Sequence, residues 1–337
     1  MYKLFHNRQE GDMSRRKREK VVLSAYDAEI YEALQKPEIF ADLFNGSLFA
    51  GQQLIREDML EEENEKELIK AQDSQGNPTI IYRVRDNSKK GYFSEKRLKV
   101  ILAVENQRAV HYGMPVRNMM YDAISYAKEA KSLESKNRKE GVLKAGKEFL
   151  SGLKKEDRLL PLLTLVFYYG EDQAWDGPVS LHEMLLIPKE LELWKKYIPD
   201  YKINLVSSRT VQKENFHTGL REVFELLEVF ANRDELEKLL REKEDHYKNL
   251  DEETSRLVGK FLDIPVLKEN QEKYRDERGK VNMCTAIRDM VKNGEKRGEK
   301  RSARLALLLA ERNRIGDLKK ASEDKEYRNK LFQEFGI

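Results

Sequence analysis

The sequence predicts an α/β protein in which a mixed sheet is flanked by helices and followed by an all-helical C-terminal region. Short apolar runs rich in β-branched residues alternate with a long helical pattern up to residue 206. Beyond that point only helical spacing and dense mixed charge remain. We therefore divide the chain into a basic tail at 1–23, an α/β domain at 24–206 and a helical region at 207–337.

The N-terminal part should contain the tail, one interrupted helix and an acidic connection. The tail includes MSRRKREK, a basic run without apolar periodicity, which is either a mobile solvated tail or an arm that contacts nucleic acid. From Tyr26 apolar residues recur at three- and four-residue steps, with an interruption at Pro37, which predicts a helix packed on a core. The acidic stretch EDMLEEENEKEL, at 57–68, is expected to be solvated and partly helical.

The sheet should be formed by apolar runs that follow this connection. Alternation and β-branched content predict strands in PTIIYRV, KKGYF, LKVILAV, LLPLLTLVFYYG and YKINLV. The segment NSKKGYF, at 87–93, is polar and contains Gly91, so it makes a poor central strand. Between the third and fourth strands, MPVRNMMYDAISYAKEA has the spacing of an amphipathic helix.

Composition narrows the class of protein. With 63 Lys and Arg against 60 Asp and Glu, the net charge of +3 is too small to indicate a nucleic-acid partner, so only local clusters could do so. One cysteine, Cys284, excludes an internal disulfide framework and a cysteine-based zinc cluster, and fits a reducing compartment. We find no apolar run of membrane-spanning length and no apolar signal segment, so we expect a cytoplasmic protein without a membrane partner.

Two familiar motifs are incomplete. GVLKAGKE resembles a phosphate-binding loop, but Glu148 stands where that loop needs Ser or Thr. LHEML begins like a zinc protease helix, but Leu186 stands where the second histidine is needed. We therefore expect no nucleotide loop, no zinc centre of this type and no organic cofactor.

The strongest chemical signal is VENQ, where an apolar strand ends in polar side chains. A charge at this position must be paired, hydrogen-bonded or bound to a metal. Alternation places Glu105 and Gln107 on one side of the strand and Asn106 on the other. Asp86 lies upstream, at a distance that a two-stranded hairpin can close. The two carboxylates could then bind a hard cation such as Mg²⁺.

An alternative needs no metal. Glu105 could simply end its strand by pairing with a cation such as Arg85 or Arg117, because structural ion pairs also imitate functional sites.

The order of these residues resembles the PD-(D/E)XK nuclease superfamily, in which an Asp, a strand hairpin, Glu-x-Gln or Glu-x-Lys and a helix follow one another. Within it, the sequence is most similar to the recombination-promoting nuclease (Rpn) family, whose members are often called putative transposases. The blocks that carry the resemblance lie between about residues 24 and 200, with a weaker one in VNMCTAIRDM: EIFADLFNGSLFAG, RDNSK, ILAVENQ, VHYGMPVRNMMYDAISYA and EFLSGLKKEDRLLPLLTLVFYYGEDQAWDGPVSLHEML.

The resemblance implies a restriction-endonuclease-like fold for 24–206 and metal-dependent endonuclease activity on DNA, linked to recombination, mobile elements or defence against foreign DNA. Asp86 and Glu105 would bind Mg²⁺, or another divalent cation such as Mn²⁺ or Ca²⁺. Gln107 occupies the position of the usual Lys, so it can orient water without supplying positive charge. The backbone carbonyl of Asn106 and the carboxylate of Asp42 are further candidate metal ligands.

Three more residues are candidates for DNA binding. Arg117 and Tyr121 lie four residues apart on the helix after the motif, and Arg117 is suited to a phosphate. They could equally be a cation packed against a ring on a structural helix. Asn45, one helical turn after Asp42, is the third candidate.

The C-terminal region offers two further surfaces. The basic stretch at 296–304 could hold phosphates or be a solvated helix face, and a leucine stripe that follows it needs a partner within the chain or in a homodimer. The functional alternative to a nuclease is a catalytically silent member of the same fold that binds DNA or a protein.

Overall fold

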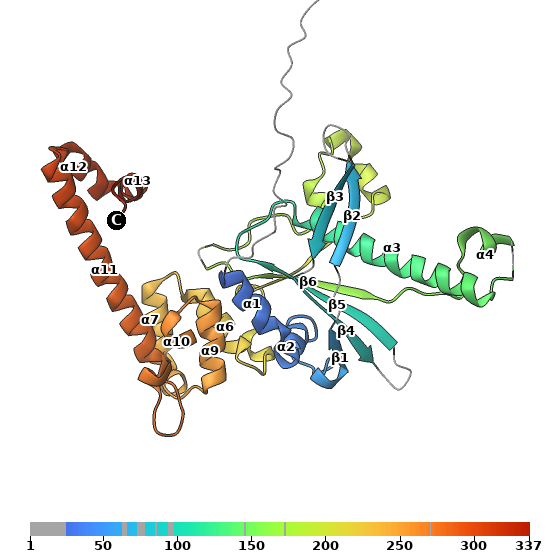
Figure 1. Ribbon diagram of the computed structural model, residues 1–337, viewed down its shortest axis with the longest axis horizontal. Helices are drawn as coiled ribbons and strands as arrows, with labels where there is room; N and C mark the ends of the chain where they lie inside the picture. The colour runs from blue at the N-terminus through green and yellow to red at the C-terminus, as the bar shows by residue number, and fades with distance from the viewer. Residues whose placement is uncertain are drawn as a thin grey trace, which may run out of the picture.

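The computed structural model of the chain describes residues 25–62, 66–72, 78–84, 86–93, 98–144, 146–171, 173–269 and 271–337. The basic tail predicted at 1–23 and Arg85, one of the two cations considered as a partner for Glu105, lie outside these residues. Figure 1 shows a twisted sheet with helices on both faces, and a C-terminal helix that projects from the rest of the molecule.

A five-stranded mixed sheet forms the centre of the α/β part. Its strands, in the order β1-β4-β5-β6-β7, are β1 (Leu60–Glu62), β4 (Asn87–Phe93), β5 (Leu98–Gln107), β6 (Leu162–Tyr168) and β7 (Asn204–Ser207). The β1, β4 and β5 strands are antiparallel, whereas β5, β6 and β7 are parallel. The predicted α/β class with a mixed sheet is confirmed.

The structure adds two strands to those predicted and changes the pairing of another. In the described part of the acidic connection, η1 (Glu57–Met59) is helical, in agreement with the prediction, but two strands that were not predicted, β1 and β2 (Lys66–Gln72), follow it. The strand predicted in PTIIYRV exists as β3 (Pro78–Val84), but it pairs with β2 in a separate two-stranded ribbon. The poor strand pattern of NSKKGYF nevertheless forms β4, which pairs with β1 on one side and β5 on the other.

One face of the sheet packs against helices from both ends of the chain. These are α1 (Ala25–Gln35), α2 (Pro37–Leu48), α6 (Leu220–Val229) and α9 (Glu252–Phe261). Phe167 of β6 joins them, because its ring centroid lies 5.6 Å from the ring centroids of both Phe224 and Phe261. The hydrophobic core is therefore continuous across the boundary predicted at residue 206.

The opposite face of the sheet is covered by α3 (Met114–Glu140) and by the connection between β6 and β7. Met114 packs with Val166 and Ile203 in a small apolar cluster on this side. The far end of α3 extends beyond the sheet, as Figure 1 shows. The short elements of this half are α4 (Gly146–Ser151), α5 (Leu181–Met184), η2 (Lys189–Tyr197) and η3 (Lys213–Asn215).

The C-terminal region is helical, as predicted. Its other elements are α7 (Arg233–Glu242), α8 (Glu244–Tyr247), α10 (Pro265–Glu269), η4 (Gln271–Tyr274), α11 (Met283–Glu311), α12 (Ile315–Glu323) and α13 (Lys325–Phe335). The first turns of α11 are buried in the main core, whereas its far end forms a second, small core with α12 and α13. None of the helices in the described part of the chain has the length and apolarity needed to cross a membrane.

Candidate functional site

Glu105 lies at the end of β5 on the face of the sheet that α3 covers. Its register partner in β6 is Val166, which packs against that helix. The Glu105 side chain has no solvent exposure, and its Oε2 lies 3.6 Å from Nη2 of Arg117, in the second turn of α3. The ion pair considered as the alternative is therefore present, and it provides a counter-charge for a carboxylate that would otherwise be costly to bury.

Asp86 stands immediately before β4 and reaches the same end of β5. Since Asn87 pairs with Val104, the register extended by one residue sets Asp86 opposite Glu105. The Asp86 Oδ2 accepts a hydrogen bond of 2.7 Å from the backbone N–H of Asn106. The hairpin predicted from the spacing thus brings the two acidic positions together.

The electrostatics connect Asp86, Glu105 and Arg117. Burial raises the pKa of Asp86, the Asn106 N–H and the Arg117 guanidinium partly offset this rise, and the Asp27 carboxylate adds to it. Burial acts to lower the pKa of Arg117, but the Glu105 carboxylate foremost, with Tyr121 and Asp86, raises it overall. Both carboxylates therefore lie close enough to the Arg117 guanidinium to interact with its charge.

The amide side chains of the motif form a chain of hydrogen bonds. Gln107, which is largely buried, donates from Nε2 to the Asn106 carbonyl oxygen at 2.7 Å. The side chain of Asn106 leaves the other face of the sheet, as predicted, and donates to Oδ1 of Asn87 at 2.9 Å. Asn87 in turn donates to the Tyr31 carbonyl of α1 at 3.1 Å. The carbonyl of Asn106 therefore already accepts one of the two hydrogen bonds that its lone pairs allow.

Asp27, in the first turn of α1, is a site residue that the sequence analysis missed. Its carboxylate accepts a hydrogen bond of 3.0 Å from the Tyr169 hydroxyl, and its charge raises the pKa of Asp86. Burial first, and then Asp27, raises the pKa of Tyr169, so this hydroxyl stays protonated and donates. The sequence signal that could have indicated Asp27 is its position as an acidic residue in the first turn of the first amphipathic helix.

Asp42 has a role that the sequence did not indicate. Its two carboxylate oxygens accept hydrogen bonds from the His217 N–H at 3.0 and 3.1 Å, from the Thr218 N–H at 2.9 Å and from the Thr218 hydroxyl at 2.6 Å. These bonds join α2 to the segment that leads into α6. They account for the buried carboxylate without a metal ion, so we do not include Asp42 in the proposed centre.

Asn45 also serves the packing of the chain. Its Nδ2 donates to the Ile55 carbonyl at 2.7 Å, and its Oδ1 accepts from the Ile55 N–H at 3.0 Å. Asn45 is fully buried, so it holds the loop after α2 and does not present its amide to DNA.

Arg117 and Tyr121 lie together as the spacing predicted. The guanidinium carbon is 5.7 Å from the centroid of the Tyr121 ring. Tyr121 is only 3% exposed, so it supports Arg117 and offers no ring for stacking on a base. Arg117 is 26% exposed and can reach solvent, which keeps it available to a phosphate.

Metal binding can be judged from these side chains. No three acidic, histidine or cysteine side chains in the described ranges converge on one metal position. A closed cage of protein ligands is therefore absent from these ranges. Mg²⁺, however, is usually held by one or two carboxylates together with water and substrate phosphates. Asp86 and Glu105, which share one cationic neighbour, fit that kind of open site.

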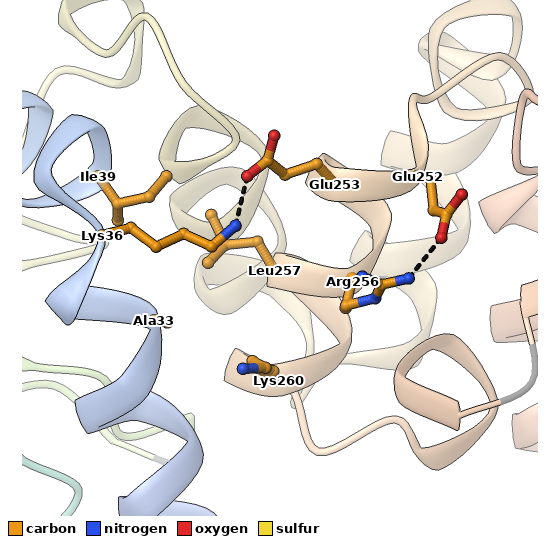
Figure 2. A pocket seen from close by; sticks show the side chains of 8 residues that line it. All are labelled: Ala33, Lys36, Ile39, Glu252, Glu253, Arg256, Leu257 and Lys260. Atoms are coloured by element: carbon orange, nitrogen blue, oxygen red, sulfur yellow. Dashed lines mark hydrogen bonds and ion pairs between the residues drawn. The ribbon is translucent and has the colours of Figure 1, made fainter.

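A prominent hollow in the described structure lies away from these residues. It has a volume of about 460 Å³ and lies between the α1–α2 region and α9, as Figure 2 shows. Its three basic side chains are ion-paired: Lys36 with Glu253 and Arg256 with Glu252, as Figure 2 shows, and Lys260 with Glu32. Because these charges are compensated, we assign the hollow no part in the chemistry.

Comparison with known proteins identifies no relative. No family model matches the chain, and no curated protein or solved structure matches it significantly. The fold and the site define an α/β protein with a mixed sheet and a pair of carboxylates at the end of an antiparallel hairpin. Its function must be argued from this site.

The raised pKa of Asp86 predicts a gain in stability when the charge is removed. A carboxyl group whose pKa is higher in the folded than in the unfolded chain stabilises the fold below its unfolded pKa, and this contribution is lost as the pH rises through the folded pKa. Asp86→Asn keeps an acceptor for the Asn106 N–H. It should therefore unfold at higher urea concentration than the wild type at pH 8, with a smaller difference at pH 4. A variant that is less stable at pH 8 would contradict this.

Proposed function

We propose that the protein is a metal-dependent DNA endonuclease that hydrolyses phosphodiester bonds, with Asp86 and Glu105 as its metal ligands. The observation that carries the proposal is the antiparallel register of β4 and β5. It sets Asp86 opposite Glu105, where both feel the charge of Arg117. The resemblance of the ordered sequence blocks to the Rpn family supports the same conclusion.

The divalent cation would supply Lewis acidity, lowering the pKa of a bound water and offsetting charge on the scissile phosphate. Asp86 must lose its proton to serve as a ligand, so its raised pKa makes cation binding favour higher pH. Hydrolysis forms a bond between the water oxygen and phosphorus and breaks the bond to one sugar oxygen, which takes up a proton. The exposed part of Arg117 can hold a phosphate oxygen beside the reacting group.

The second candidate function is a catalytically silent protein that binds DNA or a protein through the same fold. The ion pair between Arg117 and Glu105 favours it, because the pair compensates the charge of the buried carboxylate without a metal ion. Fold alone does not decide activity.

A plasmid-nicking assay separates the two functions. The wild-type protein should nick supercoiled DNA in Mg²⁺ or Mn²⁺ and not in excess chelator. DNA binding without nicking under any of these ions would support the silent protein instead. Ca²⁺ should be tested for cation binding alone, because it also prefers oxygen ligands but tolerates longer and less regular geometry.

Gln107→Lys is expected to keep cleavage or raise it by up to about tenfold, because a hydrogen bond from a charged group is stronger by about 1 kcal/mol. The ammonium group would stand beside the developing negative charge, where the Gln107 amide now donates to the Asn106 carbonyl. Gln107→Met, which is similar in length and lacks a polar group, is the control and should lose activity. A folded but inactive Lys variant would show that the amide itself is required.

A further inference from the structure

We propose that the far half of α11, together with α12 and α13, forms an arm that binds the phosphate backbone of nucleic acid. This inference goes beyond the proposed nuclease, because binding at the arm does not depend on Asp86 or Glu105. Figure 1 shows the arm projecting from the body of the molecule, with α12 and α13 at its end.

The middle of α11 is a helix without a supporting core. Every residue from 292 to 304 is exposed, whereas the turns before it belong to the main core and the turns after it to the small terminal core. This stretch has six Lys and Arg residues against two Glu residues. It is therefore much more basic than the nearly neutral chain, which is the local clustering that a polyanion needs.

Five of the six basic residues of this stretch form two neighbouring rows along the helix, which we call the basic stripe. At 3.6 residues per turn, positions that are four apart lie almost in line. Lys296, Lys300 and Arg304 form one row, and Arg297 and Arg301 form the neighbouring row. The acidic residues lie elsewhere, and Glu295 is ion-paired with Arg233 of α7.

The charges of the stripe are available to a ligand. Within the described ranges, no acidic side chain forms an ion pair with Lys296, Arg297, Lys300 or Arg304. This differs from the basic residues around the hollow of Figure 2, which are compensated.

A second observation points to the same ligand. A hollow of about 430 Å³ lies between α11, α12 and α13 and is continuous with the basic stripe through Arg301. Its polar lining consists of Arg301, Lys325, Arg328, Ser302, Ser322 and Asn329. None of the described residues that line it is acidic. Cationic, hydroxyl and amide donors without a carboxylate form an environment suited to phosphate oxygens.

The guanidinium of Arg301 is held in place at the junction of the stripe and the hollow. Its Nη2 donates to the backbone oxygen of Ile337 at 2.7 Å, and its guanidinium carbon lies 4.3 Å from the centroid of the Phe332 ring. A guanidinium fixed in this way loses little freedom when it binds an anion. The fold of the terminal core thus prepares one of the cationic groups.

Nucleic acid fits this surface better than a lipid surface does. A helix that lies on a membrane needs a large apolar face beside its basic one. Residues 292–304 contain no apolar side chain larger than that of Ala303. The basic stretch at 292–304 therefore offers charge without apolar residues to insert, which matches a hydrated phosphate backbone.

The test uses the full-length protein in excess chelator, so that no metal-dependent cleavage occurs. Binding to a fluorescent duplex of about 30 base pairs is measured by anisotropy over a range of salt concentrations, because each lost phosphate contact lowers the salt slope by about 0.9. Lys300→Gln combined with Arg304→Gln removes two charges of the stripe. Lys325→Gln tests the hollow separately. Circular dichroism should confirm that α11 keeps its helix, since Lys, Arg and Gln have similar helix propensities.

The matched control is Lys238→Gln combined with Arg241→Gln on α7. It changes the net charge by the same amount, but these residues pair with Glu242 and Glu237. The stripe variant should bind about tenfold more weakly at moderate salt, with a salt slope lower by roughly 1 to 2. Lys325→Gln, which removes one charge, should lower the salt slope by about half as much. The control should match the wild type.

Three outcomes of the DNA-binding assay would overturn the proposal. They are an unchanged affinity and slope in the stripe variant, an equal loss in the control, and no DNA binding by the wild type. Weaker binding of the stripe variant to phosphatidylserine vesicles, with DNA binding intact, would also overturn it in favour of a membrane. A wild-type protein that binds DNA through the arm but does not nick plasmid DNA in Mg²⁺ or Mn²⁺ would instead refute the proposed nuclease and leave the arm intact.

Discussion

Glu105→Gln is expected to lower Mg²⁺-dependent cleavage by about two to three orders of magnitude, because loss of a metal ligand removes several kcal/mol of transition-state stabilisation. The substitution keeps the size and shape of a fully buried side chain, so it should leave the sheet intact. It removes the negative charge that faces Arg117 at 3.6 Å. The nicking rate and the Mn²⁺ affinity, measured by calorimetry, should both decrease in this variant.

Two comparisons make this result interpretable. Glu140→Gln, at the exposed far end of α3, removes the same charge away from the site and should cleave like the wild type. Full nicking activity in purified Glu105→Gln would show either that Glu105 is no ligand or that the activity comes from a contaminant. Unchanged Mn²⁺ affinity with lost cleavage would place Glu105 in the chemistry and not in cation binding.

The parts of the fold that were predicted correctly depend on local signals. The apolar run of β5 and its alternation indicated which face Glu105 and Asn106 would each take, and the hydrogen bond from Asn106 to Asn87 agrees with it. Pro37 separates two helices because proline is tolerated in the first turn of a helix and not in its interior. The spacing of Asp86 and Glu105 correctly indicated a hairpin.

The parts that were missed depend on distant partners. β4 tolerates Lys89 in its interior because the ammonium group donates to the Gln35 carbonyl at 2.9 Å and lies 5.5 Å from the centroid of the Phe40 ring. Those groups belong to α1 and α2, so a local pattern could not reveal them. The same holds for the helices beyond residue 206, whose composition resembles a separate unit although Phe224 and Phe261 pack on the sheet.

Within the candidate site, the sequence could not distinguish a carboxylate that lies near Asp86 from one that only holds the fold together. Asp27 and Asp42 both lie in the first two helices among apolar neighbours. Asp27 lies close enough to Asp86 to raise its pKa, whereas Asp42 binds backbone N–H groups about 175 residues away. Only the packing of α2 against the segment before α6 separates the two roles.

Asp42→Asn is expected to lower the stability of the protein strongly without changing its DNA cleavage. Both oxygens of Asp42 accept hydrogen bonds from the His217 and Thr218 segment. An Asn side chain would turn an NH₂ group toward at least one of these donors and leave it unpaired. Each buried group left unpaired costs about 1–3 kcal/mol, so the free energy of unfolding should fall by about 2–5 kcal/mol.

This loss of stability should arise from weaker attachment of the N-terminal end of α6 to α2. The carboxylate lies beside the N-terminal end of that helix, where a negative charge is favourable, and α6 contributes Val223 and Phe224 to the core. Urea unfolding monitored by circular dichroism should therefore show a lower midpoint with a similar slope. Asp58→Asn is the matched control, because Asp58 pairs with Arg56 at the surface, where solvent screens the charges and the pair contributes little to stability.

The same variant tests whether Asp42 belongs to the metal centre. If its role is structural, Asp42→Asn measured at a temperature where it remains folded should bind Mn²⁺ and nick plasmid DNA like the wild type. The interactions of Asp42 with His217 and Thr218 already occupy both of its oxygens, so a cation would have to displace them. A variant that keeps its stability but loses Mn²⁺ binding would restore Asp42 as a ligand and would require this segment to rearrange when the metal binds.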